Sequence, residues 1–223
     1  MARKPSKKKA GAKKIAGTKK AGAKKTGASA TDLSRHIIDT AFELARERGW
    51  RDLSLAEIAE AAGVSLSRLH PIFPSKQAIL EGFADRVDAA MLGEGSEPLE
   101  TPARDRLFDM LMRRFDVLQP YREALAVILQ DQLRDPLASC CGLGRLGRSM
   151  ALTLEAAGFS TTGCRGVLRR KGLAAIYLAT MRVWLRDDSE DMAKTMAYLD
   201  RQLARVDSLL GRLKRVRPHR QAA

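Results

Sequence analysis

Residues 37–80 read IIDTAFELARERGWRDLSLAEIAEAAGVSLSRLHPIFPSKQAIL, and this stretch holds the clearest signals of local structure in the chain. Its first part has apolar residues at helical spacing from Ile38 to Ala45. One helix face is therefore apolar, and Gly49 follows as a C-terminal stop signal. The pattern predicts a helix over 32–48.

The middle of the stretch contains the signals for two short helices. Ser54 and Glu57 form an S-x-x-E capping box, which predicts a helix that ends near Gly63. Ser65 stands where it can cap a further helix. Two short helices joined by a turn that contains glycine are typical of a helix-turn-helix, in which the second helix lies in the major groove of DNA. From periodicity alone, a tight helical turn in an ordinary bundle is an equally good interpretation.

The first turn of the second short helix holds the candidate base-reading residues. These are Leu66, Ser67 and Arg68, and a guanidinium can form two parallel hydrogen bonds to guanine. Pro71 follows shortly. A proline inside a regular helix costs about 3 kcal/mol, because it lacks an N–H and clashes with the carbonyl four residues earlier. We therefore expect this helix to be kinked or cut short after Arg68.

The same 44 residues resemble, without gaps, the DNA-binding domain of the TetR family of transcriptional regulators. The resemblance implies that Lys76 contacts a phosphate from a helix N-terminus, where the helix dipole already favours anions. His70 stands where the family usually has a tyrosine that touches the DNA backbone; it can donate a hydrogen bond or be a surface histidine without a role. The matching positions are Gly49, Trp50, Ser54, Leu55, Ile58, Ala59, Ala62, Gly63, Val64, Ser65, Leu69 and Phe73 to Lys76. The expected DNA-binding residues are Ser54, Ser65, Leu66, Ser67, Arg68, His70 and Lys76.

From Thr31 onward the periodicity is helical nearly throughout, so the expected fold class is all-α. The TetR resemblance implies a three-helix helix-turn-helix domain over 31–92 and a helical ligand-binding and dimerisation bundle over 103–214. A Gly- and Pro-containing linker at 93–102 separates the two. After the FPSK stretch a longer fourth helix is expected. The further helices are expected near 103–118, 120–133, 136–157, 163–186 and 189–214.

Basic charge is concentrated at the N-terminus. Residues 1–30 contain ten lysines and Arg3 without any acidic residue, which accounts for +11 of the net charge of +14. This segment repeats AGAKK and has almost no large aliphatic residues, so we expect it to be disordered and to resemble the tails of linker histones. Residues 215–223 form a second basic tail. A polyanionic partner is implied, nucleic acid first and an anionic membrane surface second. The candidate non-specific DNA contacts are Lys7, Lys8, Lys9, Lys13, Lys14, Lys19, Lys20, Lys24 and Lys25.

The C-terminal half contains two amphipathic stripes and many methionines. In TetR-like regulators the last two helices pair with those of a second subunit, which implies a homodimer. Stripes from Leu173 to Trp184 and from Met196 to Leu210 are the candidates, although such a stripe is more often intramolecular core. Methionines suit an adaptable cavity for a small apolar ligand, yet they fill ordinary cores as readily. The candidate pocket residues are Met110, Met150, Tyr177, Met181 and Trp184.

Residues 173–206 carry a second resemblance. They are similar to the C-terminal end of the lipid-binding accessory family of ubiquinone biosynthesis, which shares the TetR fold but has lost DNA binding. A vestigial helix-turn-helix is consistent with Pro71, whereas the basic tail has no evident role in delivering a quinone precursor. The residues that carry this resemblance are Trp184, Asp188, Ser189, Asp191, Thr195, Leu199 and Asp200.

Other function classes are not expected. The three histidines are dispersed, the three cysteines lack metal-site spacing, and no Ser or Cys has a nucleophile context, so neither an enzyme nor a metal site is predicted. The GLGRLG at 142–147 matches a dinucleotide fingerprint, but the preceding strand is missing, so no cofactor is expected. No apolar run reaches membrane-spanning length, which predicts no stable membrane insertion.

The sequence thus predicts a cytoplasmic, nucleoid-associated regulator that binds double-stranded DNA as a dimer and responds to a small apolar or lipid-like ligand. One alternative is a non-enzymatic lipid- or isoprenoid-binding accessory protein of ubiquinone biosynthesis. Another is a nucleoid-associated protein in which the tail provides most of the binding, which would show little sequence preference and a strong dependence on salt.

Overall fold

The computed structural model describes Met1, residues 22–93 and residues 100–215, and within these residues it contains helices and no strand. The all-α fold class is confirmed. The helices are α1 (Gly22–Arg48), α2 (Leu55–Ala61), α3 (Leu66–Leu69), α4 (Lys76–Met91), α5 (Ala103–Leu118), the 3-10 helix η1 (Gln119–Tyr121), α6 (Arg122–Leu133), α7 (Pro136–Ala156), α8 (Gly163–Trp184) and α9 (Ala193–Arg215).

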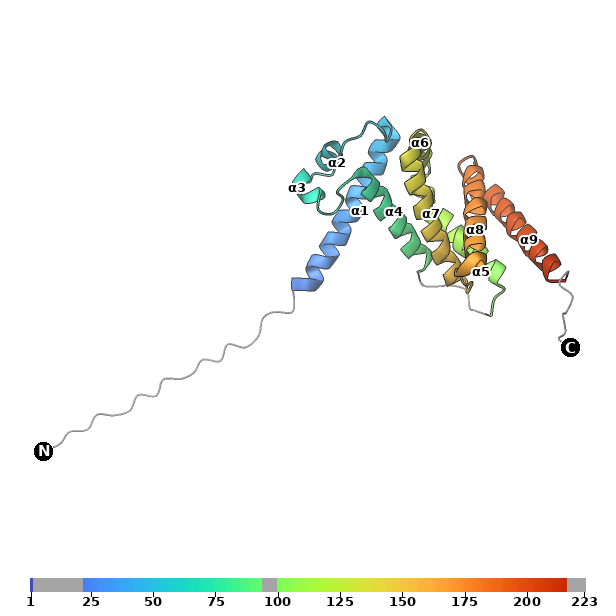
Figure 1. Cartoon of the computed structure of the whole chain (residues 1–223). Helices are drawn as coiled ribbons and strands as arrows, with labels where there is room; N and C mark the ends of the chain where they lie inside the picture. Colours follow the sequence, from blue (N-terminus) through green and yellow to red (C-terminus); the bar gives the residue numbers. More distant parts are fainter. Residues whose placement is uncertain (2–21, 94–99, 216–223) are drawn as a thin grey trace.

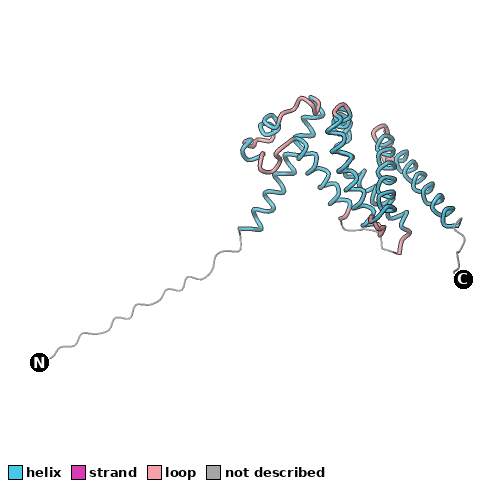
Figure 2. The backbone as a smooth tube through the Cα atoms, in the orientation of Figure 1, coloured by secondary structure: helices cyan, strands magenta, loops and turns pink. Residues whose placement is uncertain are grey.

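The helices form two groups that lie side by side. Helices α1 to α4 form one group, with α2 and α3 at its outer end, and α5 to α9 form a stacked bundle (Figure 1). Helix α4 packs against both α1 and α5, and α1 also packs against α6. The tube view shows only short loops between the described helices (Figure 2). The short α2–α3 pair packs on α1, and α1 and α4 join it to the bundle.

Local sequence signals explain where several helices begin. The hydroxyl of Ser54 accepts a hydrogen bond from the N–H of Glu57, whose carboxylate accepts one from the N–H of Ser54, so the predicted capping box is formed. Ser75 caps α4 by accepting from the N–H of Ala78. Asp135 caps α7 in the same way. These caps satisfy N–H groups that have no partner within their own helix.

Aromatic residues anchor the core of each group. Phe42 and Phe83 lie with ring centroids 4.3 Å apart, and Tyr121 meets both rings edge-on. In the bundle, the ring of Phe115 stacks on Tyr177 at 5.4 Å, and Trp184 is fully buried. Such pairs stabilise a core beyond their area of burial. Trp50 is also buried, as expected of a core residue rather than a site residue.

Two helix boundaries differ from expectation. Helix α1 begins at Gly22 instead of near residue 32, because alanines and lysines that favour helix extend a helix already nucleated by its packed half. Helix α9 begins at Ala193 instead of near residue 189, because Met192 adopts a left-handed conformation at φ 54°. Disorder was expected over 1–30, but residues 22–30 belong to α1, and residues 2–21 lie outside the described residues. So do residues 94–99 of the linker and 216–223 of the C-terminal tail.

Candidate nucleic-acid interface

Helices α2 and α3 form a helix-turn-helix with a tight turn. Gly63 has φ +65°, a left-handed conformation that glycine adopts without steric cost. The N–H of Val64 donates to the carbonyl of Ala59 at 2.9 Å, which closes the turn. Nε2 of His36 lies 3.2 Å from the carbonyl oxygen of Ala62 and ties the turn to α1. The turn thus has a fixed geometry on α1.

Helix α3 is a single turn that ends at Leu69, two residues before Pro71. The N–H of His70 still donates to Leu66, but Pro71 has no N–H to offer to Ser67. The chain continues as a turn, in which the N–H groups of Ile72 and Phe73 both donate to the carbonyl of Leu69. The expectation that this helix is cut short is confirmed, and Leu69 is its buried anchor.

The first turn of α3 presents its other side chains to solvent. Leu66 is 45% exposed, and Ser67, Arg68 and His70 are exposed as well. Arg68 has no hydrogen bond or ion pair with any residue that the structure describes. Its guanidinium is therefore available to an external acceptor. The hydroxyl of Ser65 lies 3.0 Å from that of Ser67, so these two candidate contacts are partners of each other.

Ser54 is the first candidate contact whose polar group is already used. Its hydroxyl donates to Glu57 at 2.7 Å while it accepts from the N–H of the same residue. These hydrogen bonds from Ser54 hold the pKa of Glu57 below its usual value. Ser54 is exposed, but its evident role is to begin α2.

Lys76 lies at the start of α4, as the resemblance implied, but its ammonium has partners within the chain. Nζ donates to the carbonyl oxygens of Trp50 at 2.9 Å and Arg51 at 2.8 Å, and it lies 5.6 Å from the centroid of the Trp50 ring. Burial lowers the pKa of Lys76, and the carboxylates of Asp52 and Asp131 partly oppose this. An ammonium has three N–H donors, so one remains for a phosphate.

The structure also shows a residue beside this interface that the sequence patterns did not single out. Asp131, in the last turn of α6, accepts hydrogen bonds from the N–H groups of Trp50 and Arg51, both at 3.0 Å. The sequence places Asp131 on a helix expected near 120–133. Nothing in that pattern indicates contact with a loop 80 residues earlier.

The structure does not describe the side chains of the lysines that are expected to contact DNA non-specifically. Lys24 and Lys25 lie on the first turn of α1. The other seven, Lys7, Lys8, Lys9, Lys13, Lys14, Lys19 and Lys20, belong to residues 2–21. Their role remains a prediction.

The five candidate pocket residues are all buried in the bundle. Trp184 Nε1 donates to the amide oxygen of Gln119 at 2.8 Å, and Tyr177 accepts at its hydroxyl from Nε of Arg114 at 3.2 Å. The remaining three are Met110, Met150 and Met181. Their side chains are part of the packed core.

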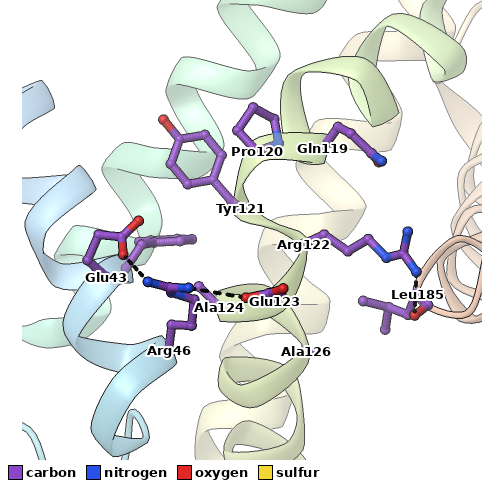
Figure 3. A pocket seen from close by; sticks show the side chains of 11 residues that line it. Glu43, Arg46, Gln119, Pro120, Tyr121, Arg122, Glu123, Ala124, Ala126 and Leu185 are labelled. Carbon is purple, nitrogen blue, oxygen red and sulfur yellow. Dashed lines mark hydrogen bonds and ion pairs between the residues drawn. The ribbon is translucent and has the colours of Figure 1, made fainter. Parts of the chain in front are cut away.

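A cavity of about 640 Å³ lies elsewhere, between α1 and the start of α6. Figure 3 shows its polar walls, with Arg46 between Glu43 and Glu123, and Arg122 reaching to the carbonyl of Leu185. Both walls carry charged side chains that are already paired, so the cavity differs from the apolar pocket that was expected.

The described part of the chain lacks the features of several other kinds of site. It holds no group of three or more His, Cys, Asp or Glu side chains placed to bind a metal ion. None of its helices is long and apolar enough to span a membrane. The GLGRLG segment lies inside α7 rather than after a strand, so it lacks the context of a dinucleotide site.

Comparisons with known proteins agree with both resemblances. Residues 37–82 match the family described as bacterial regulatory proteins, tetR family. Residues 161–210 match the family described as COQ9. Among curated proteins, none matches the chain.

Solved structures similar to this chain include several regulators. A TetR transcriptional regulator from Nitrosomonas europaea is 28% identical, with a TM-score of 0.67, and the match covers 79% of this chain and 99% of that chain. A TetR transcriptional regulator from Rhodococcus sp. is 19% identical, with a TM-score of 0.58, over 79% and 96%. A tetR-family regulator from Streptomyces coelicolor is 20% identical, with a TM-score of 0.53, over 82% and 89%. The last two are similar in fold alone.

These likenesses first define a class, that of all-helical proteins with the architecture of bacterial transcriptional regulators. More particularly, residues 37–82 match the N-terminal domain of the tetR family, and the fold is similar to that of TetR regulators.

Proposed function

We propose that this protein is a transcriptional regulator that binds an operator in double-stranded DNA through the helix-turn-helix of residues 31–92. The observation that carries the proposal is the exposed first turn of α3. There Arg68 has no partner among the described residues and Leu66 and Ser67 face solvent. A free guanidinium at this point of a recognition helix can form two hydrogen bonds to guanine.

We propose further that the protein acts as a homodimer. Most of the stripe from Leu173 to Trp184, and Leu199 and Leu203 of the stripe from Met196 to Leu210, are buried within the bundle, so we place the pairing surface on another face. The outer face of α8 suits this role, because Leu168 and Leu178 are 72% and 41% exposed. Two copies that pair there would match the symmetry of a palindromic operator.

A small apolar or lipid-like ligand would act in the bundle of residues 103–214. Buried methionines there can repack around a guest more easily than branched side chains. Repacking would alter the spacing of the two recognition helices, and so the affinity for DNA. The lysines of residues 1–30 would add affinity for any sequence by releasing counterions, which suits a cytoplasmic, nucleoid-associated protein.

One observation favours a second function. The match of residues 161–210 to COQ9, together with the shortened α3, fits a lipid-binding accessory protein with a vestigial helix-turn-helix. Such a protein would carry isoprenoid or phospholipid and would select no operator.

Selection of bound fragments from sheared genomic DNA at physiological salt separates the two functions. The protein for this experiment lacks residues 2–21, which leaves every described helix intact and removes most of the basic tail. A recurrent palindrome-like site is the result expected of the regulator. No enrichment, with lipid identified by mass spectrometry in the same preparation, would support the accessory function instead.

A further inference from the structure

The carboxylate of Asp131 joins the C-terminal bundle to the loop that precedes α2. Its Oδ2 atom accepts from the backbone N–H of Trp50 and of Arg51, both at 3.0 Å, while Oδ1 pairs with Arg134 at 3.1 Å. The side chain of Asp131 is only 13% exposed. Hydrogen bonds to an ionised acceptor are about twice as strong as neutral ones, so this is a firm attachment.

Lys76 binds the same two residues through their carbonyl groups. Its Nζ donates to Trp50 at 2.9 Å and to Arg51 at 2.8 Å. Gly49 just before them has φ +88°, a conformation that turns the chain sharply after α1. The loop is thus held between a carboxylate on α6 and an ammonium on α4.

We propose that Asp131 is a positioning residue for DNA binding, which fixes the loop at residues 50 and 51 and thereby aims the remaining N–H of Lys76 at a DNA phosphate. The inference rests on the proposed function. Without the carboxylate, the loop N–H groups lose their acceptor and the two carbonyls no longer hold the ammonium in one place. Because α6 belongs to the bundle, a shift of α6 against α1 would move Asp131, then the loop at residues 50 and 51, and so change the position of the Lys76 ammonium.

The sign of the effect distinguishes positioning from simple electrostatics. Removal of a negative charge near a polyanion ordinarily strengthens binding, because like charges repel. Positioning predicts the opposite, that loss of Asp131 weakens binding to DNA. Each phosphate contact adds about 0.9 to the slope of log affinity against log salt concentration, so the loss of one contact is measurable.

The test uses the full chain and a duplex that carries the selected site. Asp131→Ala, Lys76→Ala and the double variant are compared with Asp131→Asn, which keeps an oxygen acceptor for the loop. Glu123→Ala is the matched control, because Glu123 also joins α6 to α1, through Arg46, but does not touch the loop. The melting temperature of each variant is recorded, and Asp131→Ser replaces Asp131→Ala if the latter does not fold.

We expect Asp131→Ala to lower the slope of log affinity against log salt concentration by about one and to weaken binding several-fold. Lys76→Ala should have the same two effects. The double variant should bind DNA as tightly as either single variant. Asp131→Asn and Glu123→Ala should keep the wild-type slope. An unchanged slope for Asp131→Ala, or additive losses in the double variant, would overturn the positioning role. If the wild-type chain selects no site at all, the proposed function itself fails, which is a separate outcome.

Discussion

The carboxylate of Asp187 accepts hydrogen bonds from both the backbone N–H and the hydroxyl of Thr195, at 2.8 and 2.7 Å. Ser189 donates to the other oxygen of the same carboxylate through its N–H and its hydroxyl. Asp187 is 1% exposed, so these donors replace its water shell. One buried carboxylate therefore fixes the turn between α8 and α9.

Replacement of Asp187 by alanine should lower the free energy of unfolding by about 3 kcal/mol, because it leaves buried donors of Ser189 and Thr195 without an acceptor. Urea denaturation measures this. Asp188→Ala is the adjacent control, since the side chain of Asp188 is 87% exposed and pairs only at the surface with Arg122. Equal losses in both variants would show that the turn does not depend on Asp187.

The same carboxylate predicts a dependence of stability on pH. Burial alone would raise the pKa of Asp187, but the hydrogen bonds from Ser189 and Thr195 outweigh it and hold the pKa well below its usual value of 3.8. A lowered pKa in the folded state means that the stabilisation is present above pH of about 4 and is lost as the pH falls through the folded pKa. The stability difference between wild type and Asp187→Asn should therefore shrink on acidification. A difference that stays constant from pH 6 to pH 3 would contradict this.

Arg114 of α5 pairs with Asp88 of α4 inside the protein and also donates to the hydroxyl of Tyr177. Arg114→Met leaves Asp88 largely buried, with the hydroxyl of Ser149 as its only side-chain donor among the described residues, so a loss of about 3–5 kcal/mol is expected in thermal or urea unfolding. Arg46→Met removes an exposed arginine paired with two exposed glutamates and should change little. If Arg114→Met and Arg46→Met lowered the free energy of unfolding equally, the buried ion pair would not be what stabilises the contact between α4 and the bundle.

The outer face of α8 should carry the dimer contact. Aspartate at both Leu168 and Leu178 would place like charges opposite each other across the two-fold axis and should convert dimer to monomer in light scattering. The same change at Leu143, which is 59% exposed on α7, should leave the dimer intact. A wild-type monomer, or a dimer unaffected by the α8 changes, would rule out this interface.

Local patterns predicted the helices and the turn of the helix-turn-helix, because capping and helical periodicity depend on neighbours in the chain. The capping box of Ser54 and Glu57 formed as expected, and Pro71 ended α3 as its missing N–H required. Methionines and apolar stripes fit both a core and a ligand pocket, and the five candidate pocket residues are all buried in the bundle.

Contacts between segments that are distant in the chain could not be predicted from the sequence. Asp131 contacts a loop some 80 residues earlier, and its partners there are backbone N–H groups, which have no residue signature. The ammonium of Lys76 was expected at a phosphate, yet its two bonds to carbonyl groups depend on how α4 meets the end of α1. Such contacts arise only from the folded arrangement of α1, α4 and α6.

If Arg68 on α3 reads a base, its loss must change the preference for one base pair. Wild type, Arg68→Ala and the control Arg186→Ala are titrated with duplexes in which each position of the selected site is changed in turn. Arg186 is an exposed arginine between α8 and α9, outside the helix-turn-helix. We expect Arg68→Ala to lose about 1–3 kcal/mol of discrimination at one base pair of each half-site and to keep the discrimination at the other positions. An equal loss of affinity on every duplex would contradict it and leave Arg68 as a phosphate contact.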